Sequence, residues 1–153
     1  MRFPEPALTR VAAALPGGPG WSYEPKWDGF RALVGRAGGS GQVVSRTGHH
    51  LGSRYPELVR AAERLLPEDT IVDGEMIAVA EDGVPDFWEL QRRLGLAGVR
   101  AEAEARRRPV HLVVFDLVRA EGADLLDEPL RDRRERLEAL LPAAPGVQRT
   151  LHV

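Results

Sequence analysis

Two apolar segments constrain the fold more than any other part of the sequence. Residues 110–118 are rich in β-branched side chains and bounded by polar residues, which predicts a central strand of a sheet. Residues 70–79 predict a second buried strand, although Asp73, Gly74 and Glu75 interrupt the apolar run. A buried carboxylate is costly unless it is hydrogen-bonded or near a cation, so packing alone gives little reason for these acids. The central glycine fits close approach of a ligand or another backbone; alternatively, Asp73-Gly74 forms a hairpin turn.

Shorter segments complete the pattern. Further strands are expected at residues 21–25, 30–36, 42–46 and from 147 onward, the middle two joined by the Gly-rich turn 37–41. Helices are expected at residues 54–66, 87–94 and 130–141, from apolar spacing and from capping by Asp86. The sequence leaves two structures open for residues 7–15, a short helix or an irregular segment that lies on the body of the protein. Residues 98–108 are expected to be either a solvated helix or a mobile loop. Asp82-Gly83 is expected to form the end of a hairpin. No parallel strand–helix–strand alternation is seen, so the predicted class is α+β, with largely antiparallel sheets flanked by helices.

Lys26 is the only lysine among 21 basic residues. Arginine replaces lysine in most surface roles, but it cannot act as a neutral amine nucleophile because guanidinium stays protonated in proteins. Lys26 is therefore a candidate for catalysis, and apolar walls from Trp27 and Phe30 with the nearby cation Arg31 would favour loss of its proton. Asp28 would hold that proton, so it fits an orienting or metal-side role. The alternative is that codon bias toward arginine left one lysine by chance.

Lys26-Trp27-Asp28-Gly29 resembles the K-x-D-G signature of the covalent nucleotidyltransferases, which include ATP-dependent DNA ligases, RNA ligases and mRNA-capping enzymes. Three later segments resemble further blocks of these enzymes in the same order: S-R-x-G at residues 45–48, D-G-E at 73–75 and F-D at 115–116. Each alone also fits a polar turn, a hairpin or a core aromatic residue. Their order across residues 24–118 favours the family, and the likeness is greatest to bacterial ATP-dependent DNA ligases.

This resemblance implies a nucleotidyltransferase (ATP-grasp-like) adenylation domain with a nucleotide pocket between sheets. Lys26 would attack the α-phosphate of ATP to form lysyl-AMP, and the AMP would pass to the 5′-phosphate of nicked double-stranded DNA during repair or recombination. Five residues would bind the nucleotide: Glu24, Arg31, Arg46, Glu75 and Phe115. The backbone around Glu24 would meet the adenine edge, Phe115 would stack on the base, and Glu75 would bind the ribose. Arg31 and Arg46 would lie at the ribose and phosphates. Magnesium would neutralise the triphosphate, with Asp28 and Glu75 as metal-side carboxylates.

The family continues with an E-G-x-V-x-K block, a K-x-K block and an oligonucleotide-binding domain, none of which is found up to Val153. Residues 1–153 are thus expected to be the N-terminal portion of an adenylation domain, inefficient by itself in ligation and self-adenylylation. Three alternatives stay open: a non-catalytic nucleotide-binding remnant, an RNA ligase or capping-type enzyme, and an α+β domain with chance motif matches.

Composition and charge limit the chemistry and the cellular location that can be expected of this protein. The absence of cysteine excludes disulfides and thiolate metal sites. Residues 1–15 lack the apolar run of a signal peptide, so a cytoplasmic protein without membrane contact is expected, as a monomer. The net charge of −2 does not itself indicate nucleic-acid binding. The arginines at 106–108 could bind phosphate, but the interleaved Glu102 and Glu104 favour a solvated face.

Overall fold

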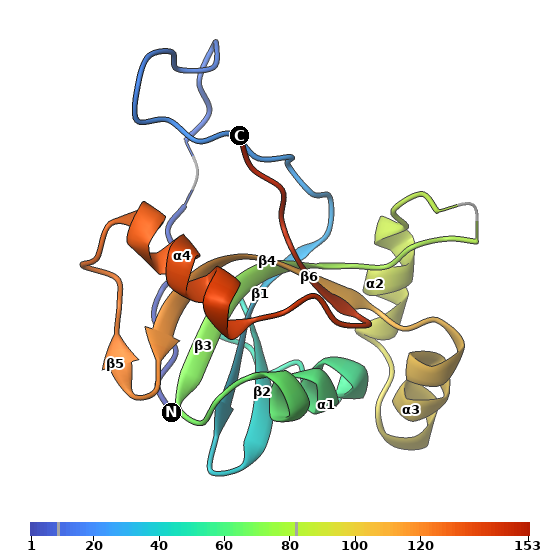
Figure 1. The fold of residues 1–153 in the computed structure, drawn as a ribbon. Helices are drawn as coiled ribbons and strands as arrows, with labels where there is room; N and C mark the ends of the chain where they lie inside the picture. Colours follow the sequence, from blue (N-terminus) through green and yellow to red (C-terminus); the bar gives the residue numbers. More distant parts are fainter. Residues whose placement is uncertain (9, 82) are drawn as a thin grey trace.

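A six-stranded sheet forms the centre of the chain (Figure 1). The computed structural model describes residues 1–8, 10–81 and 83–153. The strands are β1 (Phe30–Ala37), β2 (Ser40–Ser45), β3 (Thr70–Ile77), β4 (His111–Ala120), β5 (Ala123–Asp124) and β6 (Val147–Arg149). Their order is β2-β1-β3-β4-β5, and β6 pairs with β4. Each of these pairings is antiparallel except β4–β6, which is parallel. The α+β class and the largely antiparallel arrangement are confirmed, but the described strands form one sheet rather than several.

The two apolar segments lie at the middle of this sheet, as predicted. β3 is hydrogen-bonded to β1 on one side and to β4 on the other, so Asp73 and Gly74 lie inside a strand and the hairpin alternative is wrong. A Cβ atom at Gly74 would lie 2.6 Å from the carbonyl oxygen of Val113. The glycine is therefore required by the close approach of the β4 backbone.

The described residues form four helices beside the sheet: α1 (Pro56–Leu65), α2 (Phe87–Arg93), α3 (Gly98–Arg107) and α4 (Leu130–Leu140). Asp86 caps α2 as predicted, because its Oδ1 accepts a hydrogen bond from the Glu89 amide at 3.1 Å. α1 packs on β1 and β2, and α4 packs on β4, both in front of the sheet in Figure 1. The segment 98–108 is a helix rather than a loop. None of the helices in the described ranges is long and apolar enough to span a membrane.

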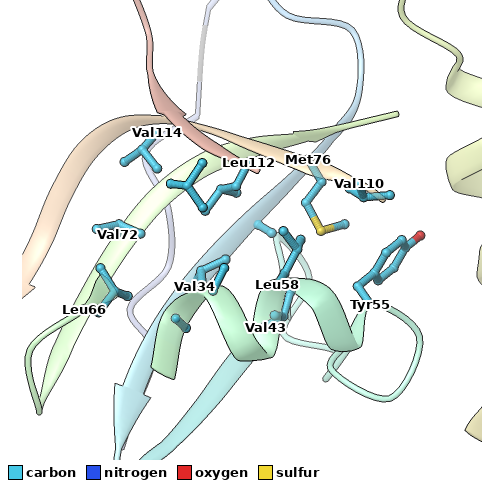
Figure 2. Close-up of a cluster of buried hydrophobic side chains, with 14 of the residues drawn as sticks. Val34, Val43, Tyr55, Leu58, Leu66, Val72, Met76, Val110, Leu112 and Val114 are labelled. Carbon is cyan, nitrogen blue, oxygen red and sulfur yellow. The ribbon is translucent and has the colours of Figure 1, made fainter. Parts of the chain in front are cut away.

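The main core fills the space between the sheet and α1 (Figure 2). It combines sheet residues such as Val34, Val72 and Leu112 with Leu58 of α1 and with Tyr55, which directly precedes α1. Residues of alternate parity point to the other face, where Leu33, Ile71 and Val118 form a small cluster covered by Phe3. One face of the sheet is thus covered by helices and the main core, while the other carries this smaller apolar cluster.

The N-terminal segment departs from the prediction. Residues 7–8 and 10–15 are not helical, so the helix alternative is wrong for the part of 7–15 that the structure describes; Thr9 lies outside it. Phe3 instead lies on the body of the sheet. Residues 21–25 form no strand, although Tyr23 exchanges backbone hydrogen bonds of 2.9 and 3.0 Å with Val153.

Two other predicted segments are shorter than expected or only partly described. The strand expected from residue 147 onward ends at Arg149. Asp82 lies outside the described residues; at the flanks of the predicted hairpin, Val79 bridges Pro85 and the Ala80 amide donates to the Val84 carbonyl at 2.9 Å.

Candidate functional site

A row of polar residues crosses the sheet on the face away from the helices. Arg31 of β1 lies directly opposite Glu75 of β3. Arg46 follows the end of β2, and its backbone N–H donates to the Arg31 carbonyl at 3.3 Å. Residues directly opposite in antiparallel strands project to the same face. The structure therefore brings together the positions of Arg31, Arg46 and Glu75, which lie far apart in sequence.

Arg31 connects this row to three other segments. Its guanidinium donates to both carboxylate oxygens of Asp73, at 3.0 and 2.7 Å. It also donates to the Ala7 carbonyl at 2.5 Å, and its Cζ atom lies 5.3 Å from the centre of the Phe115 ring. A guanidinium fixed in this way can present only a limited set of its donors to a ligand.

Burial and the charge of Arg31 act in opposite directions on the pKa values of two carboxylates, Asp73 and Glu75. Burial raises the pKa of Asp73, which is 2% exposed, while the hydrogen bonds and charge of Arg31 oppose that rise. Burial also raises the pKa of Glu75, and the charges of Lys26 and Arg31 with a hydrogen bond from the Gly29 backbone oppose it. The hydrogen bond with Asp73 in turn raises the pKa of Arg31, so this arginine stays charged.

Lys26 lies in the irregular loop before β1 and is exposed. It makes no hydrogen bond or ion pair with the residues that the structure describes, but its charge acts on Glu75. Gly29 brings this loop onto the sheet, since a Cβ atom there would lie 2.1 Å from the Met76 carbonyl oxygen. The charge of an exposed amine, without a direct bond partner among the described residues, thus acts on a half-buried carboxylate.

The apolar walls expected around the amine are not formed as predicted. Phe30 packs into the helix-covered core, with its ring 5.2 Å from that of Phe87. The Trp27 indole N–H donates to the Thr150 hydroxyl at 3.2 Å. Asp28 is exposed and, among the described residues, has no hydrogen-bond or ion-pair partner. Of the expected neighbours, Arg31 acts on the same carboxylate as Lys26, because the charges of both lower the pKa of Glu75.

The other predicted nucleotide-binding residues, Phe115, Glu24 and Arg46, lie in three different environments. Phe115 is half-buried against Arg31 and so lies next to the charged row. The Glu24 carboxylate is bound by Arg134 of α4 at 2.5 Å, so its side chain is already engaged. The Arg46 side chain is exposed and unpaired within the described ranges.

Sequence reasoning missed the second ion pair of the site. Arg133 of α4 donates to Asp116 with both its Nε and Nη2 atoms, at 2.9 and 2.8 Å. The Asp116 charge in turn contributes to the raised pKa of Asp73. Asp116 was visible as an acid in an apolar strand, but nothing in the sequence singles out Arg133 from the other arginines of its helix.

The arginine-rich surface of α3 is neutralised locally. Arg107 and Arg92 both bind Glu104, at 2.8 and 2.6 Å, and their hydrogen bonds lower the pKa of Glu104 to about 2. The interpretation of this segment as a solvated face agrees with these pairs.

The described residues contain no group of three or more His, Asp or Glu side chains arranged to hold a metal ion. Mg²⁺ in proteins usually keeps several waters and takes only one or two carboxylates. Of the two predicted metal-side carboxylates, Asp28 is exposed and Glu75 is half-buried within the row.

Arg31 lies between the carboxylates of Asp73 and Glu75 and the ring of Phe115, and the charge of the exposed Lys26 acts on Glu75. Such a set of groups fits an anionic nucleotide or phosphate ester. The family model described as ATP dependent DNA ligase domain matches residues 7–151, and the chain belongs to this family.

Several bacterial DNA ligases are similar to this chain in sequence. DNA ligase C1 of Mycolicibacterium smegmatis is 40% identical over 137 residues, which are 87% of this chain and 39% of the relative. DNA ligase C of Mycobacterium tuberculosis is 35% identical over 149 residues, covering 97% and 41% of the two chains. This chain thus spans about two fifths of the length of these relatives.

Solved structures share the fold. The ligase domain of M. tuberculosis LigD superposes with a TM-score of 0.66 at 31% identity, over 86% of this chain and 39% of that one. A mycobacterial DNA ligase D complexed with ATP and MES gives 0.64 at 30% identity, over the same shares.

Proposed function

We propose that this chain is the nucleophile-bearing portion of the adenylation domain of an ATP-dependent DNA ligase, and that Lys26 accepts the AMP group. The observation that carries the proposal is the only lysine, exposed in the loop that Gly29 packs against Glu75 and acting with Arg31 on the Glu75 charge, in a chain of this family. ATP as the nucleotide is supported by the ATP bound to the similar ligase D.

The reaction follows from the nucleophile. The neutral Nζ of Lys26 forms a bond to the α-phosphorus of ATP, the bond between that phosphorus and the bridging oxygen breaks, and pyrophosphate leaves. The displaced amine proton passes to solvent or to a nearby base. The phosphoramidate product then donates AMP to the 5′-phosphate of nicked DNA, and the neighbouring 3′-hydroxyl displaces AMP to seal the strand.

The surrounding residues have distinct roles in this proposal. Arg31, oriented by Asp73, faces the ribose and phosphates, and the exposed Arg46 is free to join it. Phe115 offers a ring face to the base. Glu75 accepts a ribose hydroxyl. Magnesium, when bound, supplies charge neutralisation at the phosphates, and Glu75 and Asp28 are the carboxylates that would hold it with phosphate oxygens.

The wider setting is part of the same proposal. The protein would act as a monomer in the cytoplasm, in DNA repair or recombination. Its full activity would depend on segments corresponding to the rest of the relatives, of which this chain spans 39% and 41%.

The test is the intact mass of the purified chain after incubation with ATP and magnesium, next to Lys26→Arg, which leaves no lysine. A second protein joins the remainder of M. smegmatis DNA ligase C1 after Val153. We expect little AMP adduct on the chain alone, a full adduct on the chimera, and none on either Lys26→Arg variant. GTP in place of ATP should give no adduct. A chimera that binds ATP without any adduct would identify a non-catalytic remnant and contradict the proposal.

A further inference from the structure

The loop that carries Lys26 has no helix or strand of its own, since residues 21–29 are irregular. Its position is therefore set by contacts with other parts of the chain. Gly29, at the end of the loop, lies against Glu75 and Met76 of β3. Ahead of Gly29, three further long-range contacts come from the last twenty residues. Figure 1 shows the C-terminal end, in red, meeting the blue segment before β1.

The first two contacts come from the residues after β6. Tyr23 exchanges two backbone hydrogen bonds with Val153, at 2.9 and 3.0 Å. The Trp27 indole donates to the Thr150 hydroxyl at 3.2 Å. These bonds fix the loop on both sides of Lys26, and Thr150 is itself held because its amide donates to the Val114 carbonyl of β4 at 2.8 Å.

The third contact comes from α4 and is ionic. Arg134 donates to the Glu24 carboxylate at 2.5 Å, and its side chain is 11% exposed. Its Nε and Nη1 atoms are buried and have no hydrogen-bond partner among the described residues. Leaving buried donors unsatisfied is costly, so this pair is a poor device for stability alone. It does fix one geometry, because a charge-assisted bond orients both groups.

We propose that Arg134 is a positioning residue that acts through Glu24 to hold the Lys26 loop against the sheet. The role of Lys26 as nucleophile rests on the proposed function, whereas the holding of the loop does not. Arg134 contacts Glu24 two residues before the lysine and contacts neither Lys26 nor Glu75 through any bond within the described ranges. Its removal should therefore loosen the loop without altering the row of residues on the sheet.

Hydrogen–deuterium exchange of the full chain tests the proposal. Arg134→Ala should speed exchange in residues 22–30 roughly tenfold, because a charged hydrogen bond that restrains the loop is lost, and leave β3 unchanged. Arg134→Lys should restore part of the protection. The matched control is Arg131→Ala on the same helix, since the Arg131 side chain is 88% exposed and pairs with its neighbour Asp132. Unchanged exchange in residues 22–30, or an increase spread equally over all strands, would overturn the proposal.

Glu24→Gln approaches the same contact from the loop and should mimic Arg134→Ala, which keeps the test valid if Arg134→Ala does not fold. AMP transfer in the chimera with the ligase C1 remainder adds a functional readout. We expect Arg134→Ala to lower kcat with the KM for ATP within about twofold, as for a group that does not touch the nucleotide. A raised KM with unchanged kcat would instead make Arg134 a nucleotide contact and refute the positioning role. No adduct on the unsubstituted chimera would count against the proposed function, and the exchange data would still decide whether Arg134 holds the loop.

Discussion

At the scale of single residues, Arg31 links four parts of the chain. It lies on β1, pairs with Asp73 of β3, faces Phe115 of β4 and binds the carbonyl of Ala7. Its partner Asp73 is almost completely buried, so the carboxylate depends on this guanidinium for compensation of its charge. Removal of either partner therefore leaves the other group without its opposite charge, which is costly.

Arg31→Ala should lower the free energy of unfolding by about 3 kcal/mol at pH 7, because it leaves Asp73 buried and unpaired. Without Arg31 the folded-state pKa of Asp73 rises further above its ordinary value of 3.8. A raised folded-state pKa favours the fold at low pH, so the deficit should vanish near pH 4 and grow as the pH rises through the new pKa. Urea unfolding at pH 4 and 7 measures it. The double variant Arg31→Ala/Asp73→Asn should lack the extra loss of stability between pH 4 and 7, because the carboxylate is gone; an equal loss there would assign the effect to another group.

Gly29→Ala should destabilise the protein by about 2–3 kcal/mol, because the added methyl group would meet the backbone of β3 rather than a movable side chain. The methyl carbon would lie 2.1 Å from the Met76 carbonyl oxygen. Gly17→Ala is the control, as nothing lies within 4 Å of a Cβ atom there. Thermal unfolding compares the two. Equal stability of both variants would show that the first strand can move away from β3 at little cost.

At the scale of elements, a buried ion pair holds α1, α2 and the start of β4 together. Arg93 is 0% exposed and binds Glu57 of α1 at 2.5 and 3.0 Å. Glu57 also accepts the Val110 amide at 3.0 Å, and the Arg93 guanidinium lies 5.0 Å from the Tyr55 ring. The Tyr55 hydroxyl donates to the Leu90 carbonyl at 2.8 Å. The helices beside the sheet are thus joined by polar contacts within an apolar core.

Tyr55 should make the fold sensitive to alkali. Burial raises its pKa from 10.0 to about 12. The unfolded chain therefore ionises first, so stability is complete below pH 10 and falls as the pH rises toward 12. The loss attributable to Tyr55 is about 2–3 kcal/mol. Denaturant unfolding at pH 9 and 11.5 should show this loss in the wild type and in Tyr23→Phe, but a smaller one in Tyr55→Phe. An identical pH profile in all three proteins would contradict the assignment.

Elements with local signals could be predicted, and contacts between distant segments could not. Asp86 predicts the start of α2, and β-branched residues predict β4, because helix capping and strand propensity depend on only a few neighbouring residues. The helix expected over residues 7–15 fails because so short a helix is marginal without packing, and Leu8, Val11 and Leu15 are 70–104% exposed. Phe30 was expected beside Lys26, yet neighbours in a strand point to opposite faces, which sends Phe30 into the core.

The candidate site was partly predictable for the same reason. The positions of Arg31 and Glu75 follow from strand register, once both strands are recognised. The ion pairs Arg133–Asp116 and Arg134–Glu24 span 17 and 110 residues, and α4 offers several equivalent arginines. Only the packing of α4 on the sheet decides which of them reaches which acid.

At the scale of the whole molecule, the two faces of the sheet differ in the kinds of residue that they carry. Helices and the apolar core cover one face, while the other holds the charged row that includes Arg31 and Glu75. The net charge of −2 is a sum over the whole chain and therefore does not reveal the charged row on one face of the sheet. Function must therefore be inferred from the local surface rather than from the total charge.

The solitary lysine has a practical consequence for anyone who studies this chain. Lys26 and the N-terminus of Met1 are its only primary amines. Reductive methylation with ¹³C-formaldehyde would therefore introduce just two sets of NMR signals, one of them on the proposed nucleophile. Binding of nucleotides or nicked DNA could then be followed at that residue, with no mutation and no assignment of the backbone.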